Sequence, residues 1–321
     1  MKEILALNAF DRATATALDV DVQRLVDQRH RVMGAASVLF YDTPIEMVSA
    51  RGAFLYDANG LAYLDCYNNV PAVGHAHPHV TAAIATQLTQ LNIHSRYLHR
   101  GMHAYAERLL ATFPAALSNL TLTCTGSESN DLALRLASAY TGHTGVIVTA
   151  AAYHGNTAAV TAVSPASARS SAYHGAVRVV RAPDSYRVPA ADLGARLAQD
   201  VEAAARDLAQ QGFGVSALLV DSIFSSDGVY ADLMTRFPVI GDVRGAGLYN
   251  AVELVDDPTT RTPAASLASA VINGLRQRQV LIGAAGPHGH ILKLRPPLCF
   301  SREHVDTLVR AITATLASLG H

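Results

Sequence analysis

A short turn near the middle of the chain carries residue types that bind anions. Residues 125–131 are Thr-Gly-Ser-Glu-Ser-Asn-Asp, between an apolar run and a segment with helical spacing. Free backbone N–H groups and the positive end of a helix at such a turn favour a phosphate. The alternative is a helix cap, in which Ser127 or Ser129 satisfies first-turn amides, and the local pattern alone favours this cap. The second glycine of a hydrolase nucleophile turn is missing, so Ser127 is not predicted to be a nucleophile.

The elements around this turn alternate between strand-like and helix-like segments. Such alternation predicts parallel βαβ units and an α/β architecture. The expected strands are residues 120–123, 146–150, 176–180 and the apolar, buried-looking run 215–220, and the expected helices are residues 131–140 and 191–211.

The two ends of the chain have a different pattern. Residues 54–57 and 61–65 are two short strands joined by an Asn-Gly turn, and Pro78 begins a helix that precedes another at residues 103–112. After Tyr230 the pattern becomes that of a small α+β module. We expect a loop and strand at 241–254, helices at 264–278 and 301–319, and strands at 280–282 and 291–294.

The composition excludes several functional classes. The chain has 321 residues, a formal net charge of −1 and 50% hydrophobic residues, which gives no electrostatic bias toward nucleic acid or membranes. No apolar run is long enough to span a bilayer, and the first thirty residues do not resemble a secretory signal. Three widely spaced cysteines favour a reducing compartment. We therefore expect a cytoplasmic protein.

Several motifs, in order along the chain, resemble those of class III aminotransferases of the fold-type-I pyridoxal-phosphate superfamily. The segments CTGSESN (124–130) and YHG (153–155) resemble the phosphate turn and the aromatic-His-Gly motif of that family. Residues 240–245 and 293–298 resemble its carboxy-terminal signatures. Residues 67–69, 74–78 and 92–97 resemble the subgroup that contains alanine–glyoxylate aminotransferase 2-like proteins and amino-alcohol phospho-lyases.

The resemblance implies a fold, a cofactor and site residues. The fold would be a large α/β domain with a mixed, mainly parallel sheet, and a small α+β domain formed by both chain ends. The cofactor would be pyridoxal phosphate, bound through Gly126, Ser127, Tyr153, His154 and Asp221, with Tyr153 stacked on the pyridine ring. In a second role, Arg295 would bind a substrate carboxylate, for which an arginine fork is suited. A structural salt bridge of Arg295 and a strand-end cap at Asp221 are the open alternatives. The resemblance also implies a homodimer acting on a small amino compound.

The chain departs from the family at one place. Residues 220–228 resemble the end of a strand that carries an acid near the cofactor, but residues 230–232 then run directly into a segment that resembles the start of the carboxy-terminal domain. In the family, the aspartate that pairs with the pyridine nitrogen and the Schiff-base lysine lie in between. We therefore expect an internal deletion near Asp232 of on the order of 100 residues, at about 30 residues per βα unit. The expected domains are 1–70 (small domain), 71–232 (truncated large domain) and 233–321 (small domain).

The scarcity of lysine is further evidence for this departure from the family. Lys2 and Lys293 are the only lysines among 25 basic residues. A Schiff base needs an amine, and the aspartate keeps the ring able to accept electrons. Neither lysine stands where the family has one, and Lys293 is expected to be structural or at the surface. No catalytic residue is therefore assigned.

Two functional hypotheses follow. One is a pyridoxal-phosphate-dependent transaminase, impaired or inactive, or a remnant of an amino-alcohol-phosphate phospho-lyase. The other is a non-catalytic, truncated homologue that pairs with a complete paralogue.

The histidines form no predicted metal site. His75, His77 and His79 alternate, but a helix beginning at Pro78 would separate them, and no further ligand joins them. His288 and His290 flank a glycine in a loop-like stretch and are expected to be exposed.

Overall fold

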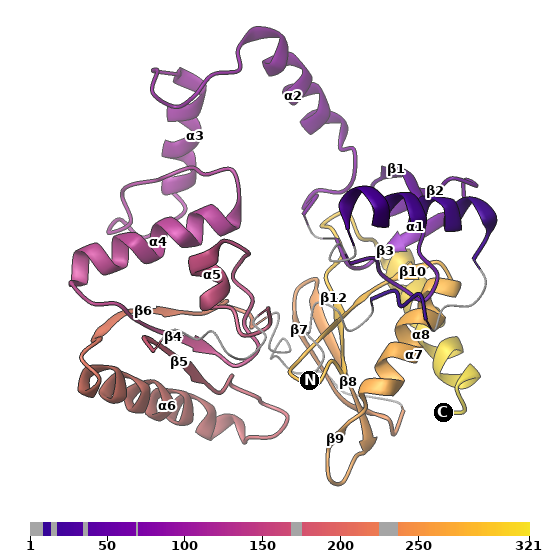
Figure 1. The fold of residues 1–321 in the computed structure, drawn as a ribbon. Helices are drawn as coiled ribbons and strands as arrows, with labels where there is room; N and C mark the ends of the chain where they lie inside the picture. The colour runs from indigo at the N-terminus through magenta and orange to yellow at the C-terminus, as the bar shows by residue number, and fades with distance from the viewer. Residues whose placement is uncertain (1–8, 14–17, 35–37, 69, 168–174, 225–236) are drawn as a thin grey trace.

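A three-stranded parallel sheet forms the centre of one half of the protein. The computed structural model describes residues 9–13, 18–34, 38–68, 70–167, 175–224 and 237–321. Strand β4 lies between β5 and β6, with α4 and α5 on one face of the sheet and α6 on the other (Figure 1). The elements of this half are α4 (Gly126–Thr141), β4 (Gly145–Thr149), α5 (Ala158–Ala162), β5 (Val177–Val180), α6 (Ala190–Gln210) and β6 (Val215–Leu219).

The burial of these strands follows from their position in the sheet. All five residues of β4 are buried, because helices cover both faces and strands flank both edges. Strand β6 pairs only with β4 among the described strands and leaves Leu218 48% exposed, so the expectation of a fully buried strand at 215–220 is wrong. The strand expected at residues 120–123 is also wrong, since this segment has no strand partner and no strand geometry.

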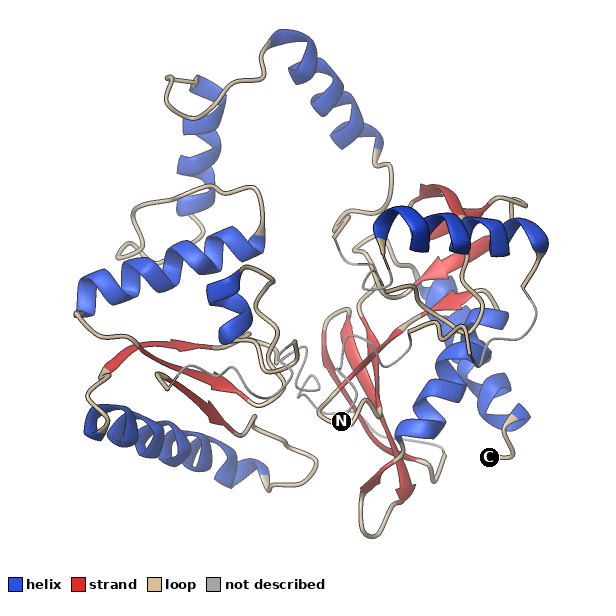
Figure 2. Ribbon diagram, viewed as in Figure 1, coloured by secondary structure: helices blue, strands red, loops and turns tan. Residues whose placement is uncertain are grey.

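The other half of the protein is built from both chain ends. Strand β3 pairs in parallel with β10, with Leu64 opposite Val280, and this pairing joins the two ends. Two sheets, of order β1-β2-β3-β10 and β11-β12-β8-β7, are flanked by α7 and α8 (Figure 2). The elements are β1 (Met47–Arg51), β2 (Phe54–Asp57), β3 (Ala62–Asp65), β7 (Ile240–Ala246), β8 (Tyr249–Asp257), β9 (Thr262–Pro263), α7 (Ala265–Gln277), β10 (Val280–Leu281), β11 (Gly283–Ala285), β12 (Ile291–Leu294) and α8 (Arg302–Ser318).

This terminal half has one large apolar core and a small second cluster of Ala251, Ala285 and Ile291. Buried side chains of β3, β8, α7, β10, β12 and α8 form a single cluster, with Ile272, Leu275 and Leu316 at most 1% exposed. The amphipathic spacing of α7 and α8 supplies that face, as the sequence predicts. The expected fold class, a parallel α/β sheet with an α+β module from both ends, is confirmed. The expected domain boundaries stay a prediction, and the junction at Asp232 lies outside the described residues.

Three further helices have little contact with either core. Helix α1 (Val20–Met33) precedes the terminal sheets, and α2 (Pro78–Gln90) and α3 (Arg100–Leu110) form an extension that joins the two halves (Figure 1). No residue of α2, α3 or α4 is buried. No helix of the described residues is long and apolar enough to cross a lipid bilayer.

Candidate cofactor-binding site

The turn at residues 124–130 forms the amino-terminal end of α4. Thr125 is the cap, because its hydroxyl accepts the Glu128 N–H at 3.1 Å while the Glu128 carboxylate accepts the N–H groups of Cys124 and Thr125. The alternative of a cap by Ser127 or Ser129 is therefore wrong, because Thr125 forms the cap. The Thr-x-x-Glu spacing, a capping-box signature, was the sequence signal for this arrangement.

This cap leaves anion-binding groups free. The N–H groups of Gly126 and Ser127 have no hydrogen-bond partner in the part of the chain that the structure describes. They lie at the positive end of a sixteen-residue helix. Space around the Gly126 Cα is open, with no atom within 4 Å of where a Cβ would lie. The turn can therefore accept a phosphate group.

The loop that follows β4 packs directly against this turn. The Ser127 hydroxyl donates to the Asn156 side-chain oxygen and accepts the Asn156 N–H, both at 3.0 Å. The Asn130 side-chain amide donates to the His154 carbonyl at 2.7 Å. At Gly155, where φ is +141°, a Cβ would lie 2.5 Å from the Ser127 hydroxyl oxygen, so only glycine fits. The two motifs, far apart in sequence, are thus held together by contacts that sequence reasoning did not identify.

His154 and Asp221 lie at the carboxyl ends of neighbouring strands. The His154 N–H donates to the Ser164 hydroxyl at 2.9 Å, and burial lowers the pKa of its ring, while the Asp221 carboxylate and the Leu219 carbonyl oppose that shift. Asp221 accepts the Ile223 N–H at 3.1 Å, so it also caps the end of β6. Tyr153 is 40% exposed beside them. The structure therefore brings together Gly126, Ser127, Tyr153, His154 and Asp221.

Arg295 lies in the other half, after β12. Its Nε donates to the Tyr67 carbonyl at 2.6 Å, and its guanidinium stacks on the Tyr67 ring at 4.6 Å from the centroid. Its terminal nitrogens have no hydrogen bond or ion pair to any described residue. No described contact joins Arg295 to the turn at α4, so the structure places it apart from the five residues above.

Lys293 is buried within the terminal half. It is 7% exposed on β12, opposite Gly283 and Ala251, and its amine lies 5.9 Å from the centroid of the Tyr249 ring. Figure 1 shows β12 in the terminal half and α4 in the half with the parallel sheet. Lys2 lies outside the described residues.

A buried charge network was missed by sequence reasoning. Glu253, fully buried on β8, binds Arg244 at 2.6 Å, Arg187 at 2.6 Å and His290 at 3.0 Å. The expectation that His290 is exposed is wrong, because this remote carboxylate holds it inside, whereas His288 is exposed. The sequence signal for this network was Glu253, a single acidic residue within the apolar run at residues 251–255.

The alternating histidines do not lie together as ligands. The side chain of His75 binds the buried Asp65 carboxylate at 2.7 Å, and His77 caps the helix that begins at Pro78. Over the described ranges, no group of three or more His, Cys, Asp or Glu side chains is arranged to hold a metal ion.

Comparison with known families decides which group this chain belongs to. The family model "Aminotransferase class-III" matches residues 40–237. This chain is a class III aminotransferase-family protein. The family uses pyridoxal phosphate, and the turn at α4 fits its phosphate through two free N–H groups and an open space above Gly126. The described residues offer no lysine beside that turn.

The similar proteins carry the names of two different enzymes, an aminotransferase and a phospho-lyase. Alanine–glyoxylate aminotransferase 2-like of Drosophila melanogaster is 26% identical over 426 residues, covering 91% of this chain and 86% of its own. Ethanolamine-phosphate phospho-lyase homolog 1 of Caenorhabditis elegans is also 26% identical and covers 97% of this chain and 98% of its own.

The solved structures agree with this placement. A phospholyase from Arthrobacter in complex with phosphoethanolamine has a TM-score of 0.84 and 30% identity, covering 92% of this chain and 99% of that one. A transaminase with L-ala, at 18% identity, has a TM-score of 0.70 and covers 100% of this chain and 98% of that one. The second likeness shows the fold alone.

Proposed function

We propose that this family member binds pyridoxal phosphate without a covalent bond and does not catalyse transamination on its own. The position of Lys293 carries this proposal, because the one lysine of the described residues is buried in a different sheet from the cofactor turn. When bound, the cofactor supplies an aldehyde and a ring that stabilises negative charge. A protein amine is needed to hold the aldehyde and to move protons, and the described residues place none beside the turn.

The residues of the site would hold the cofactor in place. The N–H groups of Gly126 and Ser127 bind the phosphate, and Tyr153 lies against the ring. His154 and Asp221 form the polar wall at the ends of β4 and β6. These roles follow the family motifs and are supported by the contacts that bring the five residues together.

The substrate that suits this site is an amino-alcohol phosphate. The phospholyase structure, at 30% identity and a TM-score of 0.84, supports this branch more than transaminases at 18% identity and 0.70 do. Arg295, half-buried with free terminal nitrogens, would bind an oxyanion of the substrate. We expect phosphoethanolamine to bind the cofactor-loaded protein more tightly than L-alanine, by titration calorimetry. Equal binding of the two compounds contradicts this branch.

An internal deletion near Asp232 explains the missing lysine. The alignment with the Drosophila relative spans 426 positions, which exceeds the 321 residues of this chain. The half-exposed edge of β6 is what remains when a parallel sheet loses its neighbouring strands. The lost segment would contain both the lysine and the aspartate that pairs with the pyridine nitrogen.

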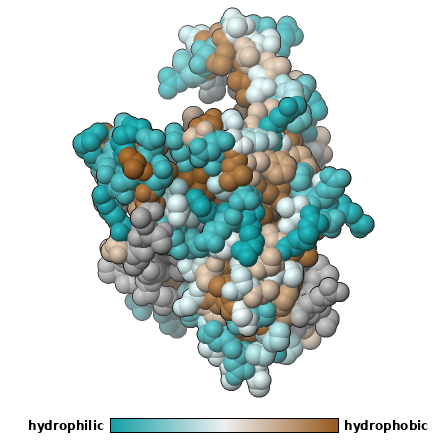
Figure 3. Space-filling view, turned by 90° about the vertical axis from the view of Figure 1, so that its right-hand side faces the viewer, coloured by the Kyte–Doolittle hydropathy of each residue, from teal (hydrophilic) through white to brown (hydrophobic). Residues whose placement is uncertain are grey.

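A second subunit would cover the exposed helices. Large apolar side chains are exposed on α2, α3 and α4, among them Ile84, Leu88 and Leu136. Figure 3 shows apolar atoms at the top of the protein, where Figure 1 places α2. We propose a homodimer or a pair with a complete paralogue through this surface. Light scattering of the purified chain, alone and with the paralogue, separates the two, and a monomer in both cases contradicts the pairing.

The cellular compartment is proposed to be the cytoplasm. Cys66, Cys124 and Cys299 are all free thiols, which suits a reducing compartment. Fractionation of cells is the measurement, and recovery in an oxidising compartment contradicts the assignment.

The central experiment is borohydride reduction after incubation with pyridoxal phosphate, followed by peptide mass mapping. We expect pyridoxal phosphate to bind reversibly, so that dialysis removes it from the protein. After reduction we expect no stoichiometric adduct on either lysine. A stoichiometric adduct on Lys293 that disappears in Lys293→Arg overturns the proposal. The Lys293→Arg variant is the matched control, because it keeps the positive charge and removes the reactive amine.

A further inference from the structure

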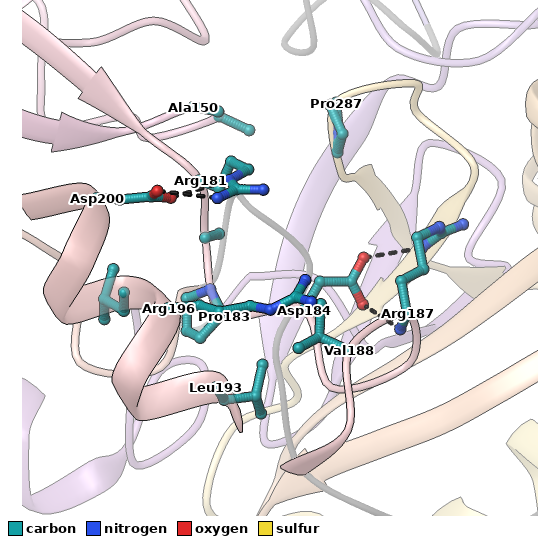
Figure 4. A pocket seen from close by; sticks show the side chains of 13 residues that line it. Ala150, Arg181, Pro183, Asp184, Arg187, Val188, Leu193, Arg196, Asp200 and Pro287 are labelled. Atoms are coloured by element: carbon teal, nitrogen blue, oxygen red, sulfur yellow. Dashed lines mark hydrogen bonds and ion pairs between the residues drawn. The ribbon is translucent and has the colours of Figure 1, made fainter. Parts of the chain in front are cut away.

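A second cavity lies at the carboxyl ends of the parallel strands, apart from the cofactor turn. It has a volume of about 290 Å³. The ends of β4 and β5 form its floor, and α6 and the loop before that helix form its wall (Figure 4). Pro287, from the loop before β12, lies across the cavity from α6 (Figure 4). The carboxyl ends of parallel strands are where open α/β sheets bind ligands.

The walls of this cavity are mostly apolar. Ala150 lies at the end of β4, Val188 on the loop, Leu193 and Leu197 on α6, and Pro287 on the opposite side. Ligand pockets typically have roughly 300–1,000 Å³, so this cavity has room for a compact molecule only. Apolar walls of this size favour a small aliphatic or aromatic body.

The charged groups at the rim are paired, with one exception. Arg181 forms two hydrogen bonds with Asp200, at 2.9 Å and 2.8 Å, and lowers the pKa of that carboxyl. Arg187 binds Asp184 at 3.0 Å and also the buried Glu253. Arg196, one turn before Asp200 on α6, also lowers the pKa of the Asp200 carboxyl by its charge, but it has no hydrogen bond or ion pair to any residue that the structure describes. The lining therefore has one positive charge in excess.

We propose that this cavity binds a small monocarboxylate, with its apolar body between Pro287 and α6 and its carboxylate on Arg196. The planar guanidinium of arginine matches a carboxylate in charge and geometry. A phosphate dianion suits the rim less well. Arg196 neutralises only one of its two negative charges, and the second charge is repelled by Asp184 and Asp200. The cavity shares no residue with the cofactor turn, so this proposal does not depend on the proposed function.

The experiment is a ¹⁹F NMR titration of the full chain with 4-fluorobenzoate. We expect saturable binding in the millimolar range, and binding at least tenfold weaker for neutral 4-fluorobenzamide and for dianionic 4-fluorophenyl phosphate. Added pyridoxal phosphate leaves the signal unchanged, which separates this cavity from the cofactor turn. Equal affinities for benzoate and benzamide overturn the proposal, as does competition by pyridoxal phosphate.

Two variants on α6 assign the binding to Arg196. Arg196→Gln is expected to weaken 4-fluorobenzoate binding about tenfold, the effect of losing one charge-assisted hydrogen bond. Arg206→Gln is the matched control, because Arg206 lies on the same helix, is exposed and does not line the cavity. Equal binding by the two variants overturns the assignment. Leu193→Trp, which fills the cavity without touching the charges, is expected to abolish binding by both the acid and the amide.

Discussion

The two halves of the protein differ in how completely their apolar surface is buried. The terminal half has a large core of twenty-one buried residues, contributed by both chain ends, and a second cluster of three. The half with the parallel sheet has two clusters of four buried residues each, on either side of β4. Its outer helices and its edge strand expose large apolar side chains. The terminal half therefore buries its apolar surface more completely than the parallel half does.

The location of the chemistry follows the same division. The cofactor turn and the second cavity border the parallel sheet, and the buried charge network and Lys293 belong to the terminal half. Arg187 connects the halves, because it lies on the loop after β5 and its guanidinium binds the Glu253 carboxylate on β8. Of the phosphate site and the amine that the family's reaction needs, the described residues place the phosphate turn beside the parallel sheet and Lys293 in the terminal half.

The largest effect that tests this division is expected for Glu253→Gln. The change removes one of the two carboxylates that bind the fully buried Arg244 guanidinium at 2.6 Å and leaves only Asp242, which costs about 3–5 kcal/mol. The free energy of unfolding, measured in urea, is the readout. Glu202→Gln is the control, because Glu202 pairs with an exposed arginine on α6, where the cost is about 0–1 kcal/mol. Equal losses in the two variants contradict a stability centred on the terminal half.

A matched leucine pair compares the two cores directly. Leu275→Ala on α7 removes a fully buried side chain and is expected to cost about 2–5 kcal/mol. Leu136→Ala on α4 removes one that is 59% exposed, and is expected to change stability by less than about 0.5 kcal/mol in the isolated subunit. Urea unfolding is measured at several protein concentrations. A loss at Leu136 that grows with concentration indicates that a partner covers α4.

Sequence patterns predicted the elements whose periodicity is local. The runs at 146–150 and 176–180 form β4 and β5, and residues 301–319 form α8. The prediction of a strand at 120–123 was wrong. A strand forms only when a neighbouring strand pairs with its backbone, and the local sequence does not show whether such a neighbour is present. Residues 20–33 carry too few regularly spaced apolar side chains to have predicted α1.

The site was predictable in part for the same reason. The resemblance to the family motifs grouped Gly126, Ser127 and Tyr153 in one site, and the structure holds the two loops that carry them against each other. The bonds from Asn156 and Asn130 that hold these loops together come from side chains with no pattern of their own. The prediction that His290 is exposed was wrong, because its burial depends on a bond to Glu253, 37 residues away.

Acid is expected to weaken the terminal half more than the other. Burial raises the pKa of Glu253, but the hydrogen bond from His290 and the charge of Arg244 outweigh it and lower the pKa from 4.5 to about 2. The folded state thus gains stability from this carboxylate above pH 4.5 and loses it as the pH falls toward 2, by about 3 kcal/mol. Urea unfolding between pH 5 and pH 2 measures the slope. The Glu253→Gln variant should lack this part of the slope, and an unchanged slope contradicts the assignment to Glu253.

The smallest effect is expected at the cofactor turn, where Ser127→Ala removes a hydroxyl from the weaker-packed half. Its Oγ donates to the Asn156 side-chain oxygen and accepts the Asn156 N–H, so the loss loosens the contact that holds the phosphate turn against the loop after β4. We expect binding of pyridoxal phosphate by equilibrium dialysis to weaken about tenfold, as for one hydrogen bond to a charged group. Pyridoxal, which has no phosphate, should bind the variant and the parent chain equally. Ser129→Ala is the control, because that hydroxyl bonds only within its own turn. If pyridoxal loses as much as pyridoxal phosphate, the hydroxyl acts by positioning the loop, and the phosphate is held by the N–H groups of α4 alone.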